Sequence, residues 1–201
     1  MKYLRAATED EVIMEFLKGE FQSKRFQTQI NEVLRGQKLN ASIIVKADLC
    51  NMEENMKRKD ILNRFRGYGR NADLFENFPS ISRWIFAECS FEDINKIRYI
   101  NYSYWNELSK YTSSPLIAAE TIREGIEIYG VSNSNSINGV KYLEQGGSFS
   151  PIILLTSDKD SYIILEGHSR MTVYGLAPEF FIGSKCYIGI CEKSALLKWN
   201  S

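Results

Sequence analysis

The sequence predicts an α+β fold, in which helices surround a small mixed sheet, with a helical extension at the N-terminus. Residues 151–156 and 162–165 are apolar runs rich in Ile and Leu that are too short for helices, and the polar residues 157–160 between them are typical of a turn. Elsewhere, apolar residues recur at helical spacing over longer segments. A few short strands among many helical segments indicate helices packed around one sheet.

The composition limits the class of protein. A hydrophobic content of 44% in 201 residues is sufficient for a packed core, and 25 basic residues balance 25 acidic ones. The overall charge therefore gives no argument for binding nucleic acid or a membrane surface. The first residues do not resemble a signal peptide, and no apolar run approaches the roughly 18 residues of a membrane span. With four cysteines outside any CxxC pair and one histidine, we expect a cytoplasmic, reduced protein without a metal site.

The first 75 residues have helical patterns. A capping box at Thr8 and Glu11 predicts a first helix, which we expect to end at Gly19. Apolar spacing predicts further helices over residues 23–36 and 52–65.

We place a boundary near residue 79, between a helical region (1–78) packed on the core and an α+β domain (79–201). A capping-box pattern at Ser90 predicts a short helix there. The expected elements of the second part are strands at 83–89, 151–156, 162–165 and 186–191, and helices at 97–108, 115–129, 137–144, 168–176 and 195–199.

The second strand of the hairpin leads into a candidate anion site, Gly167-His168-Ser169-Arg170. A glycine between a strand and a helix allows a sharp turn. The first N–H groups of the helix have no partner within it and, together with the helix dipole, favour an anion such as phosphate. The side chains of His168, Ser169 and Arg170 would add donors at the same place.

Three side chains around this turn could carry chemistry. Arg170 could bind phosphate in a bidentate manner, His168 could donate to it or transfer a proton near neutral pH, and Glu166 could hold Mg²⁺ or act as a base. Each has a structural alternative. Glu166 could face solvent, His168 could only cap the helix, and Arg170 could pair with an internal acid such as Glu107.

A basic segment lies further towards the N-terminus. It is either a surface for phosphate groups or a solvated helix face. Arg66 and Arg70 flank a glycine-rich turn that could close over an anionic ligand. The basic residues of the segment are Lys57, Arg58, Lys59, Arg64, Arg66 and Arg70.

Aromatic residues concentrate between residues 99 and 105. At helical spacing, Tyr102, Trp105 and Asn106 share one face, which either stacks on a base or forms part of the core. We include these three residues and Glu107, with Arg66 and Arg70, as accessory candidates for the site.

The order of these segments resembles the ParB/sulfiredoxin superfamily. A helix ends at Gly146-Gly147, a strand begins at Pro151, and Gly167-x-x-Arg170 opens a helix after the second strand. The resemblance covers about residues 82–192 and is sharpest over 146–176. It implies an uncharacterised ParB-like branch, of bacterial or phage origin, in which Gly167 and Arg170 hold the phosphate of a nucleotide such as ATP or CTP with Mg²⁺.

Two departures limit what the resemblance implies. His168-Ser169 replaces the Glu-Arg of the partition proteins and the Cys-His of the sulfiredoxins. Sulfinic-acid reduction and CTP hydrolysis are therefore not expected. No helix-turn-helix domain follows the motif in this sequence, so a chromosome-partition role is not expected either.

Two functional hypotheses remain, and they predict different structures. The first is an enzyme of phosphoryl transfer or phosphodiester hydrolysis, which requires Glu166 and His168 to converge in a cleft. The second is a non-catalytic nucleic-acid- or protein-binding module, which requires the basic side chains of residues 57–70 to share an exposed face. Both include a small phosphate-type ligand at the turn.

Overall fold

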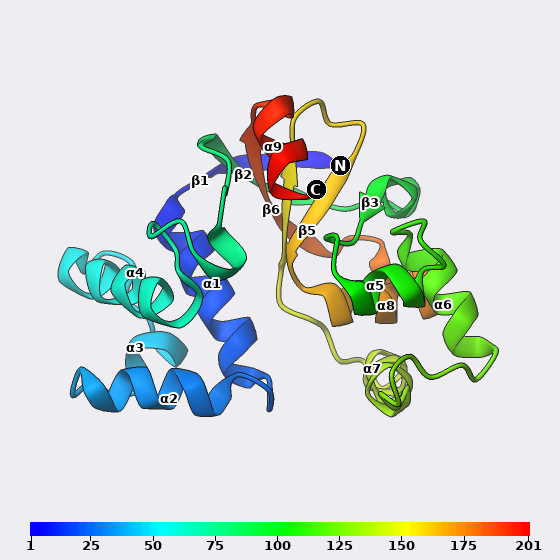
Figure 1. Cartoon of the computed structure of the whole chain (residues 1–201), viewed down its shortest axis with the longest axis horizontal. Helices are drawn as coiled ribbons and strands as arrows, with labels where there is room; N and C mark the ends of the chain where they lie inside the picture. Colours follow the sequence, from blue (N-terminus) through cyan, green and yellow to red (C-terminus); the bar gives the residue numbers. More distant parts are fainter.

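The computed structural model describes residues 1–201 and shows an α+β fold with one six-stranded mixed sheet between two groups of helices (Figure 1). The strand order is β1-β2-β6-β4-β5-β3, with parallel pairing at β6–β4 and β5–β3 and antiparallel pairing elsewhere. The predicted α+β class with a mixed sheet is therefore confirmed. The strands are β1 (Lys2–Ala7), β2 (Ile81–Glu88), β3 (Ile97–Arg98), β4 (Ile152–Thr156), β5 (Tyr162–Glu166) and β6 (Lys185–Cys191).

The helices lie on both faces of the sheet. In Figure 1 the helices of the first 75 residues lie on one side, and α5 to α8 lie on the other. The α-helices are α1 (Glu9–Gln22), α2 (Gln27–Gly36), α3 (Ser42–Val45), α4 (Met52–Arg66), α5 (Ser103–Leu108), α6 (Pro115–Arg123), α7 (Ser134–Glu144), α8 (His168–Leu176) and α9 (Lys193–Trp199). The 3-10 helices are η1 (Asp73–Phe75), η2 (Phe91–Lys96) and η3 (Pro178–Phe181).

Several local predictions differ from the structure. Residues 2–7 were expected to belong to a helical region, but they form the edge strand β1, whose partner β2 lies far along the chain. The helix expected over 97–108 is divided, because Ile97–Arg98 pairs with β5 and α5 starts only at Ser103. The helix expected to reach residue 129 ends at Arg123. The capping boxes at Thr8 and Ser90 are both formed, as predicted.

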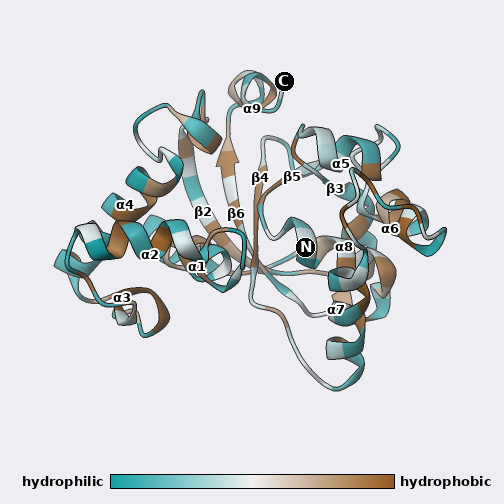
Figure 2. Ribbon diagram, turned by 60° about the horizontal axis from the view of Figure 1, so that its bottom comes forward, coloured by the Kyte–Doolittle hydropathy of each residue, from teal (hydrophilic) through white to brown (hydrophobic).

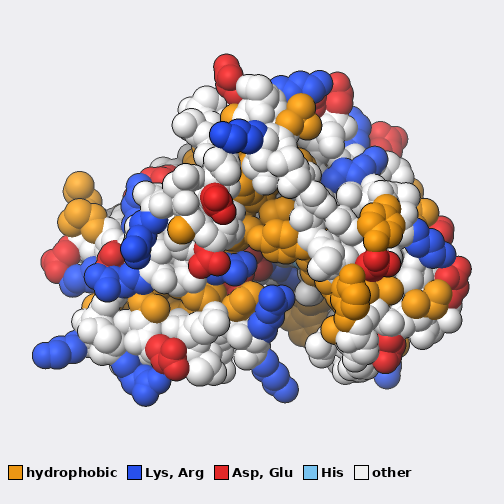
Figure 3. All heavy atoms as spheres, in the orientation of Figure 1, with side chains coloured by type: hydrophobic (Ala, Val, Ile, Leu, Met, Phe, Trp, Pro, Cys, Tyr) orange, Lys and Arg blue, Asp and Glu red, His pale blue; other side chains and the backbone are white.

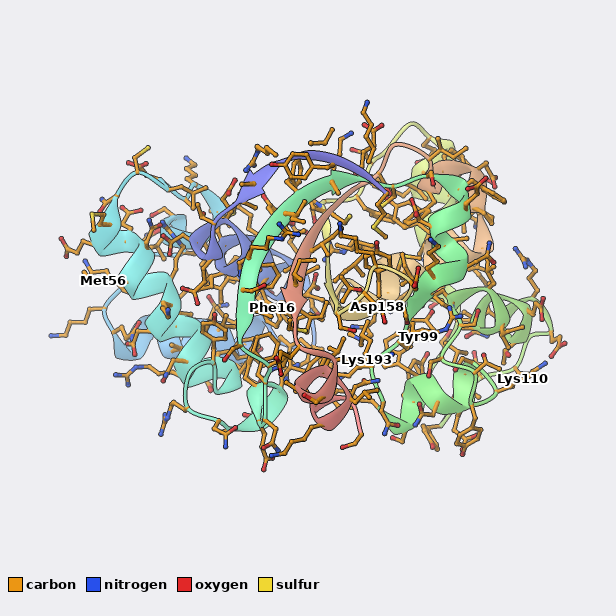
Figure 4. All side chains as sticks on the ribbon, turned by 90° about the horizontal axis from the view of Figure 1, so that it is seen from above. Phe16, Met56, Tyr99, Lys110, Asp158 and Lys193 are labelled. Carbon is orange, nitrogen blue, oxygen red and sulfur yellow. The ribbon has the colours of Figure 1, made fainter.

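The sheet separates two hydrophobic cores. Alternate residues of β4 serve both: Ile153 and Leu155 join the core under α1, whereas Ile152 and Leu154 join the core under α8. Figure 2 shows hydrophobic residues along the central strand β6. Phe16 and Tyr99 lie on opposite sides of the sheet (Figure 4). The helices of the first 75 residues thus form one of the two layers that cover the sheet.

A β-bulge interrupts the pairing of β4 and β5 near the end of β5. Ile153 pairs with Glu166, but the next residue, Leu154, pairs with Ile164, so Leu165 is an extra residue. The bulge is followed by a close approach between Glu166 and α1. A Cβ atom at Gly19 would lie 2.8 Å from Glu166 Oε1. The prediction that α1 ends at Gly19 is therefore wrong, since the helix continues to Gln22. The missing side chain at Gly19 lets the carboxylate of Glu166 approach the helix.

Candidate functional site

Gly167 makes the sharp turn from β5 into α8. Its φ is +103°, and a Cβ atom there would lie 2.7 Å from Ile152 Cγ2, so both backbone and packing require glycine. No side chain caps α8, which leaves its first N–H groups without a capping acceptor. In Figure 1 this end of α8 faces the N-terminal group of helices, and Figure 3 shows a hollow between the two groups of helices, with apolar and charged side chains on its floor.

The donors of Arg170 are occupied by acceptors within the protein. Its Nη1 donates to the carbonyl oxygens of Ser150 and Pro151, each at 2.8 Å, and to Ser150 Oγ at 2.6 Å. Its Nη2 pairs with Glu166, and Nη1 lies 4.0 Å from Glu15 Oε1. The phosphate-clamp role implied by the resemblance is therefore not supported. Arg170 is a positioning residue that ties α8 to the loop before β4.

The internal-pairing alternative for Arg170 is correct in kind, with a different acid. Glu107 accepts a hydrogen bond from the Tyr111 hydroxyl, and Asn106 donates to Asn101 Oδ1 at 2.7 Å. Both accessory candidates are engaged near α5 itself. Neither side chain makes a hydrogen bond to residues 166–170.

His168 lies against Trp105. The ring centroids of Trp105 are 4.7 Å from Tyr99 and 5.2 Å from His168, and the three rings are nearly parallel. The ring centroids of Tyr99 and His168 are 6.2 Å apart. This distance is shorter than the two stacking separations that rings on opposite faces of the indole would require. Both rings therefore pack on the same face of Trp105. His168 Nε2 is buried without a hydrogen-bond partner.

This packing keeps His168 neutral. Burial, assisted by the positive charge of Arg66, lowers the pKa of His168 to about 3. This environment does not favour the expected role as a proton shuttle near neutral pH. Glu166 is paired with Arg170 and makes no hydrogen bond to His168. The pair proposed for catalysis is not assembled.

We expect the His168 ring resonances of the folded protein to stay constant between pH 8 and pH 5. An ordinary histidine would titrate near pH 6.5 in this range, whereas a pKa of about 3 keeps His168 neutral throughout. Because His168 is the only histidine, its signals are unambiguous in an NMR titration. The protein unfolded in urea is the control and should titrate normally. A folded-state midpoint near pH 6.5 would contradict the buried environment.

Arg66 extends from the end of α4 into the same region. Its guanidinium lies over the Phe26 ring at 4.8 Å, and Nη2 is 3.7 Å from Glu20 Oε1. Its Nε is buried without a partner. Burial raises the pKa of the Tyr102 hydroxyl, and Arg66 partly opposes that rise. The charge of Arg66 contributes to the pKa shifts of both Tyr102 and His168, so Arg66 lies in the neighbourhood of both side chains.

Three charged residues at the site were missed by the sequence predictions. Glu15 and Glu20 are buried on α1, and Arg25 follows that helix. Burial raises the pKa of Glu20 to about 7, although Arg66, Arg25 and Arg170 favour its ionised form. A signal was present, since Glu20 lies four residues after Phe16 on the buried stripe of an amphipathic helix.

The basic segment does not form a free basic face. Lys57 pairs with Glu53 at 2.6 Å, and Arg64 pairs with Asp60 at 2.9 Å. Arg58 is 1% exposed, and its guanidinium donates to the Ile43 carbonyl at 3.0 Å. The condition for a module that binds through this whole segment is therefore not met. Only the end of the segment, from Arg64 to Arg70, borders an open groove.

No family model, curated protein or solved structure matches the chain. The ParB/sulfiredoxin resemblance stays a prediction. The structure has no group of three or more His, Cys, Asp or Glu side chains placed to hold a metal ion. None of its helices has the length and apolar character that crossing a bilayer requires.

Proposed function

We propose that the protein binds a phosphate-containing ligand of the nucleotide type in the hollow beside the start of α8. The observation that carries the proposal is the position of Arg66. This side chain comes from α4, yet its Nη2 lies 3.7 Å from Glu20 of α1, and the residue before Glu20, Gly19, lies against Glu166 at the end of β5. Its charge also contributes to the lowered pKa of His168 at the start of α8. A cation, an uncapped helix start and aromatic rings meet there from separate parts of the chain.

The anion would bind between α8 and Arg66. The first N–H groups of α8 have no side-chain cap, and the helix dipole makes this end positive. Arg66 Nε is buried and lacks a partner. A buried donor without an acceptor is costly, so a ligand oxygen at this position would be favourable. Ser169 is exposed in the first turn of α8 and offers a further hydroxyl.

The aromatic residues favour a nucleotide over inorganic phosphate. Tyr102 is 45% exposed, and Trp105 is partly buried with one face against Tyr99 and His168. Aromatic side chains of this kind can stack on any nucleic-acid base. This chemistry agrees with the ATP or CTP that the ParB-like resemblance implies.

The proposed function is ligand binding and includes no catalysed reaction. Glu166 is held by Arg170, and the lowered pKa of His168 leaves it unable to act as an acid near neutral pH. Arg170 keeps its positioning role. The Mg²⁺ of the expected nucleotide complex would be coordinated by the phosphates themselves, since Glu166 is already paired.

A thermal-shift assay with ATP, CTP and pyrophosphate, each with and without Mg²⁺, tests this proposal. A ligand at about 100 times its dissociation constant should stabilise the wild type by about 2.7 kcal/mol. Arg66→Gln should abolish the shift, because it removes the cation at the helix start.

The control for that assay is Lys57→Gln, which removes a cation paired with Glu53 on the exposed side of α4. It should keep the full shift. If no compound shifts the wild type, or if Arg66→Gln responds as the wild type does, the proposed site is wrong.

A further inference from the structure

We infer that the groove between α2 and α4 is a second phosphate subsite, and that the ligand is a short single-stranded oligonucleotide. The inference rests on the proposed function, because it extends the ligand from the hollow into this groove. The groove encloses about 840 Å³, which is large enough for a nucleotide-sized group.

The walls of the groove select a polar anion. Only three of its 12 lining residues are hydrophobic. Four guanidinium groups and two carboxylates, Glu32 and Asp73, line the groove. Two of the four, Arg64 and Arg66, already have an acidic neighbour, Asp60 and Glu20, so an anion would be bound mainly by the other two. The four arginines are Arg25, Arg64, Arg66 and Arg70.

Two of these arginines are free to bind. Arg25 and Arg70 are exposed and make no ion pair, in contrast to the paired lysines Lys57 and Lys59 elsewhere on α4. The guanidinium of Arg25 lies over the Phe26 ring at 4.7 Å, and that of Arg66 lies over the same ring at 4.8 Å. These contacts restrict both side chains, so less conformational entropy is lost when they bind.

The groove and the hollow share Arg66. Arg66 lines the groove, and its Nη2 lies 3.7 Å from Glu20 Oε1 in α1. Gly19, the residue before Glu20, lies against Glu166, which immediately precedes Gly167 and α8. The Tyr102 hydroxyl is close enough to Arg25 and Arg66 for both arginines to oppose the rise in its pKa. Arg66 therefore connects the groove to the region beside the start of α8.

A ligand that uses both regions must carry phosphates on either side of Arg66. A nucleic-acid strand has this repeat, and the stacking surface at Tyr102 and Trp105 requires bases with free faces. A positive groove beside aromatic rings is the usual arrangement for binding single strands. We therefore expect a single strand and not a duplex.

Fluorescence anisotropy with a labelled thymidine hexanucleotide tests the inference. The variant Arg25→Gln/Arg70→Gln should bind the hexanucleotide about tenfold more weakly, and the slope of log K against log salt should flatten by about 1.4 for two lost phosphate contacts. The control Lys46→Gln/Lys57→Gln removes the same charge from an exposed and a partly exposed position outside the groove and should bind within about twofold of the wild type. Circular dichroism checks that each variant is folded.

The outcomes separate this inference from the proposed function. If nucleotides shift the melting temperature but the hexanucleotide does not bind, the groove inference is wrong and the proposed function stands. The inference is also wrong if the groove variant binds like the control, or if tripolyphosphate or a duplex competes as well as the unlabelled hexanucleotide. If the hexanucleotide binds through Arg25 and Arg70 but Arg66→Gln has no effect, the groove is supported and the site beside α8 is wrong.

Discussion

Arg170→Met is expected to lower the free energy of unfolding by about 3–5 kcal/mol, the cost of leaving buried charges without their partner. The guanidinium holds Glu166 and three oxygen atoms of Ser150 and Pro151. Glu166 and Glu15 are 14% and 7% exposed at their side chains, so neither carboxylate is well solvated when the cation is removed. Methionine keeps the apolar stem, so that the loss reports the charge and its hydrogen bonds. Urea denaturation at pH 7 measures the difference.

Two further variants make that result specific. Arg64→Met removes an exposed ion pair with Asp60 and should change stability by less than about 1 kcal/mol. Glu166→Gln combined with Arg170→Met should be more stable than Arg170→Met alone, because one uncompensated charge is gone. A loss from Arg170→Met as small as that from Arg64→Met would show that Arg170 is not the internal link described above.

Glu20→Gln is expected to change the pH dependence of stability by about 3 kcal/mol, the equivalent of the shift in the pKa of Glu20 from 4.5 to about 7. Because burial raises this pKa, the folded state holds a proton on Glu20 that the unfolded state has released. The stabilisation from this proton is complete below pH 4.5 and is lost as the pH rises through 7. Glutamine mimics the protonated acid at every pH. Relative to the wild type, the variant should therefore gain stability between pH 5 and pH 8.

The variant and the wild type are compared at the same pH, so the contribution of His168 to the pH dependence of stability cancels. That contribution has the opposite sign to the contribution of Glu20. The lowered pKa of His168 makes the protein lose stability as the pH falls from 6.5 towards 3, in wild type and variant alike. Glu76→Gln, at an exposed position, should show no such pH-dependent gain. An equal difference between Glu20→Gln and the wild type at pH 5 and pH 8 would contradict the buried environment of Glu20.

Features that depend on neighbouring residues were predictable from the sequence. The capping boxes at Thr8 and Ser90 form because their donors and acceptors are three residues apart. The hairpin and the Gly167 turn follow from short apolar runs and from one glycine with positive φ. The position of the candidate anion turn at the start of α8 is therefore encoded locally.

Features that depend on distant residues were not predictable. β1 is mostly exposed and acquires its hydrogen bonds from β2, about eighty residues away. Gly19 looks like a helix end, yet α1 continues to Gln22, and a side chain at residue 19 would clash with Glu166. The bulge at Leu165, which precedes this contact, is a property of strand pairing that no local pattern reports.

The Gly167–Arg170 turn shows where the two kinds of information separate. Its backbone and its free N–H groups follow from local conformational preference, so they can be read from the printed sequence. The roles of its side chains depend on the electric field and packing of groups distant in sequence. Glu15 and Ser150 engage Arg170, Trp105 covers His168, and Arg66 supplies the unpaired donor. Those contacts exist only after the chain has folded, because Coulomb interactions and burial depend on distance in space and not on separation along the chain.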